Sequence, residues 1–208
     1  MFVTVEGIDG SGKTTLVRGL CSALNNKGIC VTQTAEPGGN KGATSFSGVI
    51  RDIFSCHEEK VPILSELFLL LSARIYNVEQ IIFPALSQGH WVVSDRFNDS
   101  TYAYQGYGSG FDLEAIRALI RQSGCDIEPN VTFVVDISPK IALARIKDPD
   151  AIERRSYAFY KRVREGYHAI AQHSPERVFL LQGCKSPRGL LRDALQFLDV
   201  KGLMKGKA

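Results

Sequence analysis

The segment Gly7-Ile-Asp-Gly-Ser-Gly12-Lys13-Thr14 fits the pattern G-x-x-x-x-G-K-[ST] and decides the fold of this chain. It follows a short apolar run, Phe2–Glu6, and opens a segment, Lys13–Lys27, whose leucines recur every four residues. We therefore expect a strand, a glycine turn and a helix. Such a turn aims backbone N–H groups and a helix N-terminus at one point, which suits phosphate oxygens. The expected phosphate cradle comprises Gly7, Ile8, Asp9, Gly10, Ser11, Gly12, Lys13, Thr14 and Thr15.

Four further apolar runs alternate with helical patterns along the rest of the chain. The expected strands are Ile29–Thr34, Trp91–Ser94, Val131–Asp136 and Val178–Leu181. Because the runs are continuous rather than alternating, they predict strands that are buried on both faces of a parallel sheet. The fold class is therefore α/β, with helices on both faces of a five-stranded parallel sheet and ligands beyond the carboxyl ends of the strands.

The expected helices follow from apolar spacing and from Ser-Pro starts. A helix from Pro62 carries its leucines on one face, and Pro84 should kink or interrupt it. The polar, glycine-rich stretch Asn98–Gly110 predicts a loop that can include a short helix. The remaining helices are expected at Ala43–Phe54, Leu113–Ser123, after Ser138-Pro139, at Ile152–His173, and from Ser186-Pro187 to about Leu198.

Composition excludes several classes of protein. The 208 residues, 44% hydrophobic and 23% charged, predict a single globular domain over residues 1–208. The net charge of +3 is too small for a dedicated nucleic-acid binder. Five scattered cysteines without a C-x-x-C pair argue against disulfides and a zinc site. The start shows no signal peptide, and the longest uninterrupted apolar run, Leu67–Leu71, is too short to span a membrane, so a cytoplasmic protein is expected.

A second candidate site follows the strand at Trp91–Ser94. Asp95 and Arg96 end that strand, where a parallel sheet brings them beside the phosphate cradle. A carboxylate there can hold Mg²⁺ together with Thr14, and an arginine offers a planar fork to a phosphate. Arg51 and Arg74, on the two intervening helices, would complete a clamp for a second phosphate group. An ionised phosphate oxygen as acceptor requires no general base, so catalysis would consist of positioning and charge neutralisation.

These motifs, in this order and spacing, resemble the thymidylate kinase family of P-loop enzymes, which phosphorylate dTMP. The resemblance covers nearly the whole chain and predicts a three-layer α/β/α P-loop NTPase fold with a small helical lid at about residues 145–156. It implies ATP and Mg²⁺ as cofactors, dTMP as substrate, and a homodimer packed through helices that include Pro62–Asn77. Its pieces are Gly7–Thr15, Glu36–Gly39, Ser72–Arg74, Asp95–Phe97, Ser100–Gly106 and Asp136–Pro139.

The resemblance also assigns roles to matched positions. Asp9 would meet the deoxyribose 3′-hydroxyl, and Tyr104 would exclude a 2′-hydroxyl. Arg51 and Arg96 would hold the dTMP phosphate, while Asp95 would orient them and support Mg²⁺ with Thr14. The implied catalytic residues are Lys13, Asp95, Arg96, Arg154 and Arg155. The implied substrate-binding residues are Asp9, Glu36, Arg51, Leu70, Arg74, Arg96, Thr101, Tyr104 and Gln105, with Arg74, Thr101 and Gln105 at the base.

The chain departs from the family pattern at three places. Ala35 stands where an arginine usually precedes Glu-Pro-Gly-Gly, and Leu70 stands where a phenylalanine usually stacks on thymine. Leu70 then serves either the base or only the core. In the lid, Ala151 stands where an arginine is usual, so the lid cation is open among Arg145, Arg154 and Arg155.

Two other functions remain as alternatives. A nucleotide-dependent switch would bind without phosphoryl transfer, but the chain lacks a D-x-x-G switch segment, and its nearest match to [NT]-K-x-D, Ile146–Pro149, falls in the predicted lid. A deoxynucleoside kinase would need a carboxylate base near the acceptor hydroxyl, and Glu36 is a candidate for that role.

Overall fold

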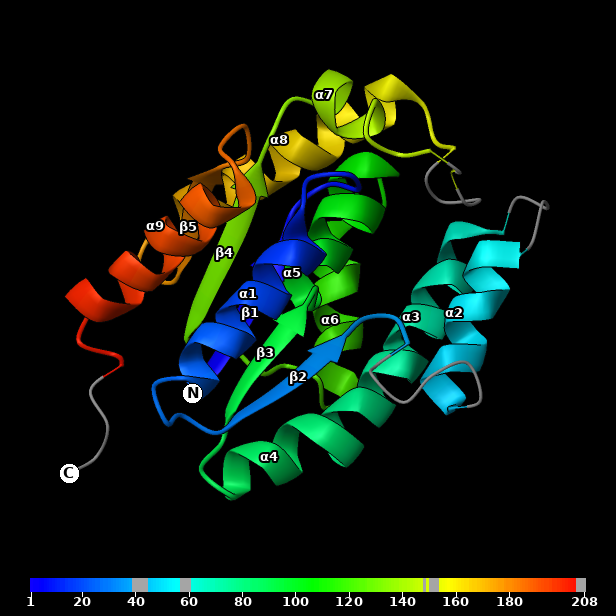
Figure 1. Ribbon diagram of the computed structural model, residues 1–208. Coiled ribbons are helices and arrows are strands. Elements are labelled where there is room, and N and C mark those ends of the chain that lie inside the picture. The colour runs from blue at the N-terminus through cyan, green and yellow to red at the C-terminus, as the bar shows by residue number, and fades with distance from the viewer. Residues whose placement is uncertain (39–44, 57–60, 148, 150–153, 205–208) are drawn as a thin grey trace.

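Five parallel strands form one sheet in the order β2-β3-β1-β4-β5. The computed structural model describes residues 1–38, 45–56, 61–147, 149 and 154–204. The strands are β1 (Phe2–Glu6), β2 (Val31–Ala35), β3 (Trp91–Asp95), β4 (Val131–Asp136) and β5 (Val178–Gln182) (Figure 1). The expected five-stranded parallel α/β fold is confirmed, and each strand lies within two residues of its expected bounds.

Strand β1 is the centre of the sheet and is buried along its whole length. It pairs with β3 on one side and β4 on the other, so Val5 lies opposite both Asp95 and Phe133. The chain that leaves β1 therefore emerges between the ends of β3 and β4. This register brings the segment after Glu6 next to Asp95 and Arg96, as expected from the sequence.

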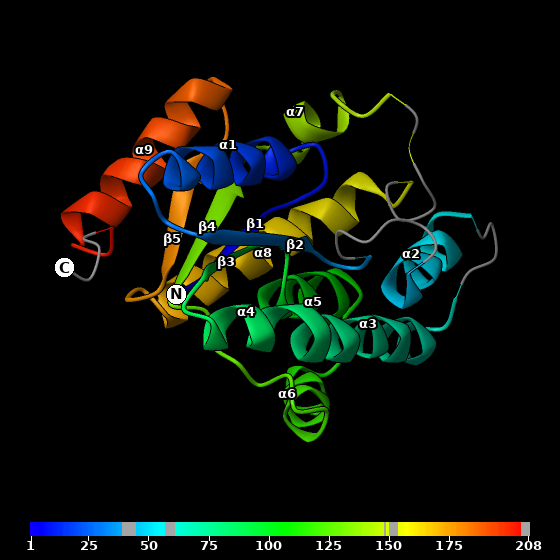
Figure 2. The same ribbon diagram turned by 60° about the horizontal axis from the view of Figure 1, so that its bottom comes forward.

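Helices cover both faces of the sheet. On one face, α1 (Lys13–Asn25) and α9 (Pro187–Val200) pack against inward-facing side chains such as Val3, Val5 and Phe133. Figure 2 shows these two helices on one side of the sheet and α3, α4, α5 and α6 on the other. The second face has two apolar clusters, one around Phe2 and Val92 and one around Val134. The core is therefore split by the sheet into an upper and a lower layer.

A helical segment of 25 residues, Ile63–Ser87, covers the lower face beside β3. It consists of α3 (Ile63–Asn77), a π-helical turn η1 (Val78–Ile82) and α4 (Phe83–Ser87). Pro84 lies in the first turn of α4, directly after the π turn. The wider π turn accommodates the proline, which has no N–H to donate, and the helix continues. The expected interruption at Pro84 is thus only a local change of pitch.

By length and composition this segment would suffice to cross a membrane, with a mean hydropathy of 1.2 over 18 residues. The helix is more apolar than the length of its uninterrupted apolar run, Leu67–Leu71, indicates. In the fold its inward-facing apolar side chains, such as Leu67 and Ile82, are fully buried in the cluster around Phe2 and Val92, whereas several apolar side chains on its outer face are exposed. The helix acts as a core helix of the sheet.

The stretch expected to be a loop, Asn98–Gly110, is helical over most of its length. It forms α5 (Asn98–Thr101) followed by a π-helical segment η2 (Tyr102–Gly108). The sequence suggested a loop because Asn, Asp, Ser and Gly favour turns on exposed surfaces. Here the side chains of Asn98, Asp99 and Ser100 are buried and find partners in the protein, so tertiary contacts override local propensity.

The remaining helices agree with the expected ones apart from their ends. Ser156 caps α8 through a bond to the Phe159 N–H, so this helix begins five residues later than expected. Residues 148 and 150–153 of the expected lid lie outside the described residues, as do the first two residues of the expected helix Ala43–Phe54. The observed bounds are α2 (Phe46–Cys56), α6 (Leu113–Gln122), α7 (Pro139–Leu143) and α8 (Tyr157–His173).

Helix α8 and segment η2 approach each other closely through two glycines. A Cβ added at Gly166 of α8 would lie 2.8 Å from the ring of Tyr107, and one at Gly108 of η2 would lie 2.6 Å from the ring of Phe159. Both distances are shorter than a van der Waals contact. The absence of side chains here lets α8 lie against η2 and bring its tyrosines over the strand ends.

We predict that Gly166→Ala destabilises the protein by about 1–3 kcal/mol, because the added methyl group overpacks this contact. Gly189→Ala is the matched control, since Gly189 also lies in a helix but its added Cβ would meet only flexible side-chain atoms at 3.4 Å. The control should be neutral or slightly stabilising. Urea unfolding of both variants measures the difference, and equal stabilities would contradict the close packing.

Candidate active site

The segment after β1 wraps into a loop whose backbone only glycine adopts readily. Gly10 has φ of 74°, and a Cβ there would lie 2.1 Å from the carbonyl oxygen of Ala142. Gly12 has φ of 98° and precedes α1 as its N-cap, without a side-chain hydrogen bond to the first turn. By contrast, side chains cap the N–H groups of α6, α8 and α9. The first turn of α1 is thus left open to an anion.

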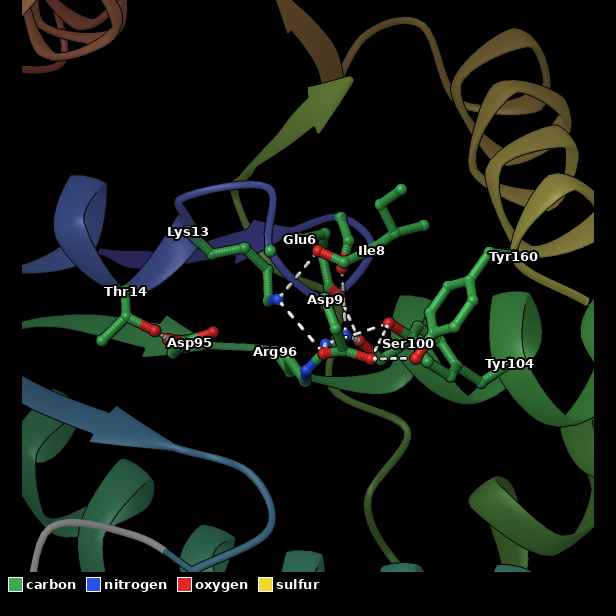
Figure 3. A network of polar contacts seen from close by, with 12 residues as sticks. Glu6, Ile8, Asp9, Lys13, Thr14, Asp95, Arg96, Ser100, Tyr104 and Tyr160 are labelled. Carbon is green, nitrogen blue, oxygen red and sulfur yellow. Dashed lines mark hydrogen bonds and ion pairs between the residues drawn. The ribbon is translucent and has the colours of Figure 1, made fainter. Parts of the chain in front are cut away.

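The two residues that end the cradle face the loop and β3. Lys13 is buried, and its Nζ donates to the Ile8 carbonyl at 3.2 Å. Burial and the Arg96 charge lower the pKa of Lys13. The Thr14 hydroxyl donates to Asp95 Oδ2 at 2.6 Å (Figure 3). The predicted pair of metal ligands, Thr14 and Asp95, therefore lies together at the end of β3.

Arg96 holds the centre of the site in an unusual backbone conformation. Its φ of 75° lies in the left-handed region, which costs free energy for a residue with a side chain. Its guanidinium donates to Gly7 O at 3.1 Å, Ser100 Oγ at 3.0 Å and the Tyr104 hydroxyl at 3.0 Å, and it forms an ion pair with Asp9. These contacts bring the loop after β1 and segment η2 onto one side chain.

Asp9 is the carboxylate on which these contacts converge. The hydroxyl groups of Tyr104 and Tyr160 donate to its Oδ2 at 2.8 and 3.1 Å, and Lys13 Nζ lies 3.7 Å from Oδ1. Burial alone would raise the pKa of Asp9, but the charges of Arg96 and Lys13 lower it to about 2. Asp9 is therefore ionised throughout the neutral pH range.

Glu6, at the end of β1, forms a second buried cluster behind Arg96. Its carboxyl group accepts from the Phe97 N–H at 2.7 Å, from Ser100 Oγ at 2.5 Å and from the Tyr167 hydroxyl at 3.1 Å. Complete burial, and to a lesser degree the nearby Asp99 charge, raises the pKa of Glu6 to about 7. Glu6 therefore titrates near neutral pH, directly beneath the residues that hold Arg96.

One face of α3 carries buried polar side chains toward the strand ends. Arg74 is 2% exposed and donates from Nε to Glu36 at 2.6 Å and from Nη1 to Asn98 at 2.9 Å. Asn77 donates to the other oxygen of Glu36 at 3.1 Å. Glu66 lies two turns before Arg74 and is 5% exposed. Both oxygens of Glu36 are thus engaged, which disfavours its role as a general base.

The structure also locates the other predicted substrate residues. Arg51 of α2 lies against Gly38, in the turn after β2. Thr101 is 1% exposed, and its hydroxyl is one of two buried side-chain polar atoms without a partner in the described part of the chain. Leu70 packs with Ile50 in a small apolar cluster. Gln105 is 4% exposed and donates to Glu66 at 2.7 Å.

The three candidate lid arginines have different surroundings. Arg145 Nη1 reaches the carbonyl oxygens of Gly10 and Ser11 at 3.4 and 3.5 Å, so it lies at the cradle. Arg154 donates to a backbone carbonyl of the neighbouring segment. Arg155 forms an ion pair with Glu66 at 2.6 Å, across the site from the cradle. In the described contacts Arg145 is the candidate nearest to the expected phosphates, whereas Ala151 lies outside the described residues.

The model of one protein family, thymidylate kinase, matches residues 5–193. The chain belongs to the thymidylate kinase family. It is 39% identical to a thymidylate kinase of Protochlamydia amoebophila over 95% of this chain and 92% of that protein. It is 40% identical to one of Prosthecochloris aestuarii, over 92% and 90%. The crystal structure of thymidylate kinase from Ehrlichia chaffeensis matches with a TM-score of 0.77 and 32% identity, over 96% of this chain and 98% of that one.

Family motifs alone did not single out several residues of this site. The sequence places Glu6 at the end of a strand, and a charged residue at the end of a mainly apolar strand is a usable signal of a functional role. Glu66 shares a helix face with Arg74, eight residues away, which periodicity could have shown. Tyr160 and Tyr167 share a face of α8, but nothing in the sequence directs that face to Asp9 and Glu6.

We predict that stability rises as the pH falls from 8 to 5, by up to about 3 kcal/mol from Glu6 alone. The sign follows because the folded-state pKa of about 7 lies above the reference value of 4.5, so the native state binds more protons between these values. Denaturant unfolding of the wild type and of Glu6→Gln measures this. The variant should lose the slope, whatever constant offset the lost acceptor causes, and an identical slope in both proteins would refute the assignment.

Proposed function

We propose that the protein transfers the γ-phosphoryl group of ATP to dTMP, giving dTDP and ADP, with Mg²⁺ as cofactor. The observation that carries the proposal is the adjacency of two phosphate-binding devices at neighbouring strand ends. Lys13 and the open helix N-terminus follow β1, while Arg96 follows β3 and shares Asp9 with Lys13. Membership of the thymidylate kinase family supports the choice of nucleotides.

The residues present fit the donor nucleotide and its metal ion. Ser11 Oγ in the cradle is a buried polar atom without a partner in the described part of the chain, as expected of a group that meets a phosphate. Thr14 and Asp95 supply the hard oxygen ligands that Mg²⁺ prefers. No cluster of three or more acidic, histidine or cysteine ligands occurs among the described residues, which suits an ion held mainly by phosphate and water.

The chain's own residues provide positioning and positive charge. When bound, Mg²⁺ neutralises charge that develops on the phosphate oxygens. Lys13 supplies a cation at the β- and γ-phosphates, and Arg96 supplies a second cation for the acceptor phosphate. Asp9 fixes both cations through its ion pairs. Because the acceptor oxygen is already ionised, the reaction needs no general base. We propose Arg145 as the lid cation, since it contacts the cradle.

The dTMP subsite is proposed to lie between α3 and η2. Arg74 uses three of its five N–H donors within the protein and retains two for the base. Thr101 contributes a hydroxyl without a partner in the described residues. Tyr104 lies beside Asp9, where it would crowd a ribose 2′-hydroxyl. Arg51 and Glu36 flank the turn after β2.

We further propose a single-domain, cytoplasmic enzyme that acts as a homodimer and uses neither nucleic acid nor a membrane. Large apolar side chains are exposed on the outer faces of α2 and α3. Phe46 and Val49 are 51% and 49% exposed, and Leu64 and Phe68 are 43% and 53% exposed. Exposed apolar side chains of this size would be covered when two copies pack through these helices.

The first prediction for this function concerns Lys13. Lys13→Ala should lower kcat by about a hundredfold or more, because it removes a cation from the transferring phosphoryl group. Lys27→Ala, just beyond the end of the same helix and exposed, is the control and should keep full activity. The assay measures ADP and dTDP from ATP and dTMP. Product from thymidine instead would support a deoxynucleoside kinase, and nucleotide binding without turnover would support a switch.

The second prediction concerns Leu70. If Leu70 faces the base, Leu70→Phe should add stacking and lower the KM for dTMP by about tenfold, while the KM for ATP stays unchanged. If Leu70 serves only its cluster with Ile50, the larger ring should lower stability by about 1–3 kcal/mol without changing the KM for dTMP. Steady-state kinetics and thermal unfolding of the same variant separate the two roles.

A further inference from the structure

The carboxylate of Glu66 joins two residues that come from distant parts of the chain. Its Oε1 accepts from Gln105 Nε2 at 2.7 Å, and its Oε2 forms an ion pair with Arg155 at 2.6 Å. Glu66 and Gln105 are 5% and 4% exposed, so water is nearly excluded from their contact. The three residues lie on α3, on η2 and just before α8. This cluster is separate from Asp9, Arg96 and the phosphate cradle.

The contact fixes which end of the Gln105 amide points away from α3. An ionised carboxylate only accepts hydrogen bonds, so the NH₂ group of Gln105 must face Glu66 and the carbonyl oxygen must face the other way. Reversing the amide would set two acceptors against each other in a buried place, at a cost of about 1–3 kcal/mol. One carboxylate therefore determines the polarity that Gln105 presents to its other side.

Arg155 holds the Glu66 carboxylate in one position through their ion pair. The Arg155 guanidinium also donates to Ser109 Oγ at 3.1 Å and lies 4.6 Å from the ring centroid of Phe159. These contacts leave the guanidinium little freedom to swing away. A buried carboxylate with a fixed cation beside it keeps its acceptor geometry, which a lone buried carboxylate would not.

We infer that Glu66 and Arg155 are positioning residues that orient the Gln105 amide and thereby select the pyrimidine base of the nucleotide. A carbonyl oxygen directed at the base accepts from N3–H of thymine, whereas N3 of cytosine is itself an acceptor and is rejected. This inference rests on the proposed placement of Gln105 at the base of dTMP. It assigns the discrimination between thymine and cytosine to a residue on α3 that need not touch the nucleotide.

The test compares kcat/KM for dTMP and dCMP in Glu66→Gln and Glu66→Asp. The amide introduced by Glu66→Gln can donate as well as accept, so Gln105 becomes free to turn and present its NH₂ group to cytosine. The ratio of kcat/KM for dTMP to that for dCMP should fall by about tenfold or more, with an absolute gain for dCMP. Glu66→Asp keeps an acceptor-only group and should retain the ratio, even where both substrates lose activity.

The matched control is Glu114→Gln, which removes the same charge from an exposed ion pair with Arg117. It should leave the ratio and both activities unchanged. A purely structural role of Glu66 would lower kcat/KM for both nucleotides alike in Glu66→Gln, and that result overturns the inference. If this variant does not fold, Glu66→Leu applies the same test, because it removes the acceptor that fixes the amide of Gln105. An unchanged ratio in folded Glu66→Leu overturns the inference as well.

Gln105→Leu separates this inference from the proposed placement on which it rests. If Gln105→Leu leaves the ratio of dTMP to dCMP unchanged, Gln105 does not read the base and the placement is wrong. If Gln105→Leu lowers the ratio but Glu66→Gln does not, the placement stands and the orienting role of Glu66 is refuted. Both variants lowering the ratio, with a gain for dCMP only in Glu66→Gln, is the result that we expect.

Discussion

The ion pair between Asp9 and Arg96 is the interaction on which the site depends. It joins the loop after β1 to the end of β3, two segments that the sheet register places side by side. In this position Arg96 adopts a left-handed backbone conformation, which costs free energy. Tyr104 from η2 and Tyr160 from α8 then bind the same carboxylate. Four elements thus meet at one partly buried pair, so none of them can shift without disturbing the others.

The site tolerates two carboxyl groups close together because their environments shift the two pKa values in opposite directions. Asp9, beside Arg96 and Lys13, has its pKa lowered to about 2, whereas Glu6, buried at the end of β1, has its pKa raised to about 7. The pKa values of two carboxyl groups three residues apart therefore differ by about five, mainly because of their environments. The charge of Arg96 acts to lower the pKa of both carboxyl groups. Protonation of Glu6 therefore leaves more of the positive charge of Arg96 uncompensated and available to a phosphate.

The sequence predicts those parts of the fold that local patterns encode. Apolar runs located all five strands, and the glycine-rich loop located the cradle, because strand burial and positive φ each restrict residue choice locally. The pairing of Thr14 with Asp95 followed from parallel sheet geometry. The prediction of a loop over Asn98–Gly110 is wrong, because the helical state of this segment depends on partners such as Cys125 and Arg177 that are distant in sequence. Tyr160 and Tyr167 reach the site for the same reason, through packing of α8 that no local pattern specifies.

The long helix of the lower layer shows how one element satisfies two demands. Its apolar face, with Leu67 and Ile82, must fill the core beneath the sheet, and this gives the helix its membrane-like hydropathy. Its polar face carries Glu66, Arg74 and Asn77, which are buried about as deeply as Leu67. Glu66 is paired with Gln105, and both Arg74 and Asn77 are paired with Glu36. Because a buried polar group is costly unless bonded, each of these side chains fixes the orientation of the group that it binds. The apolar face thus holds the helix in place, and the polar face converts that fixed position into the geometry of the site.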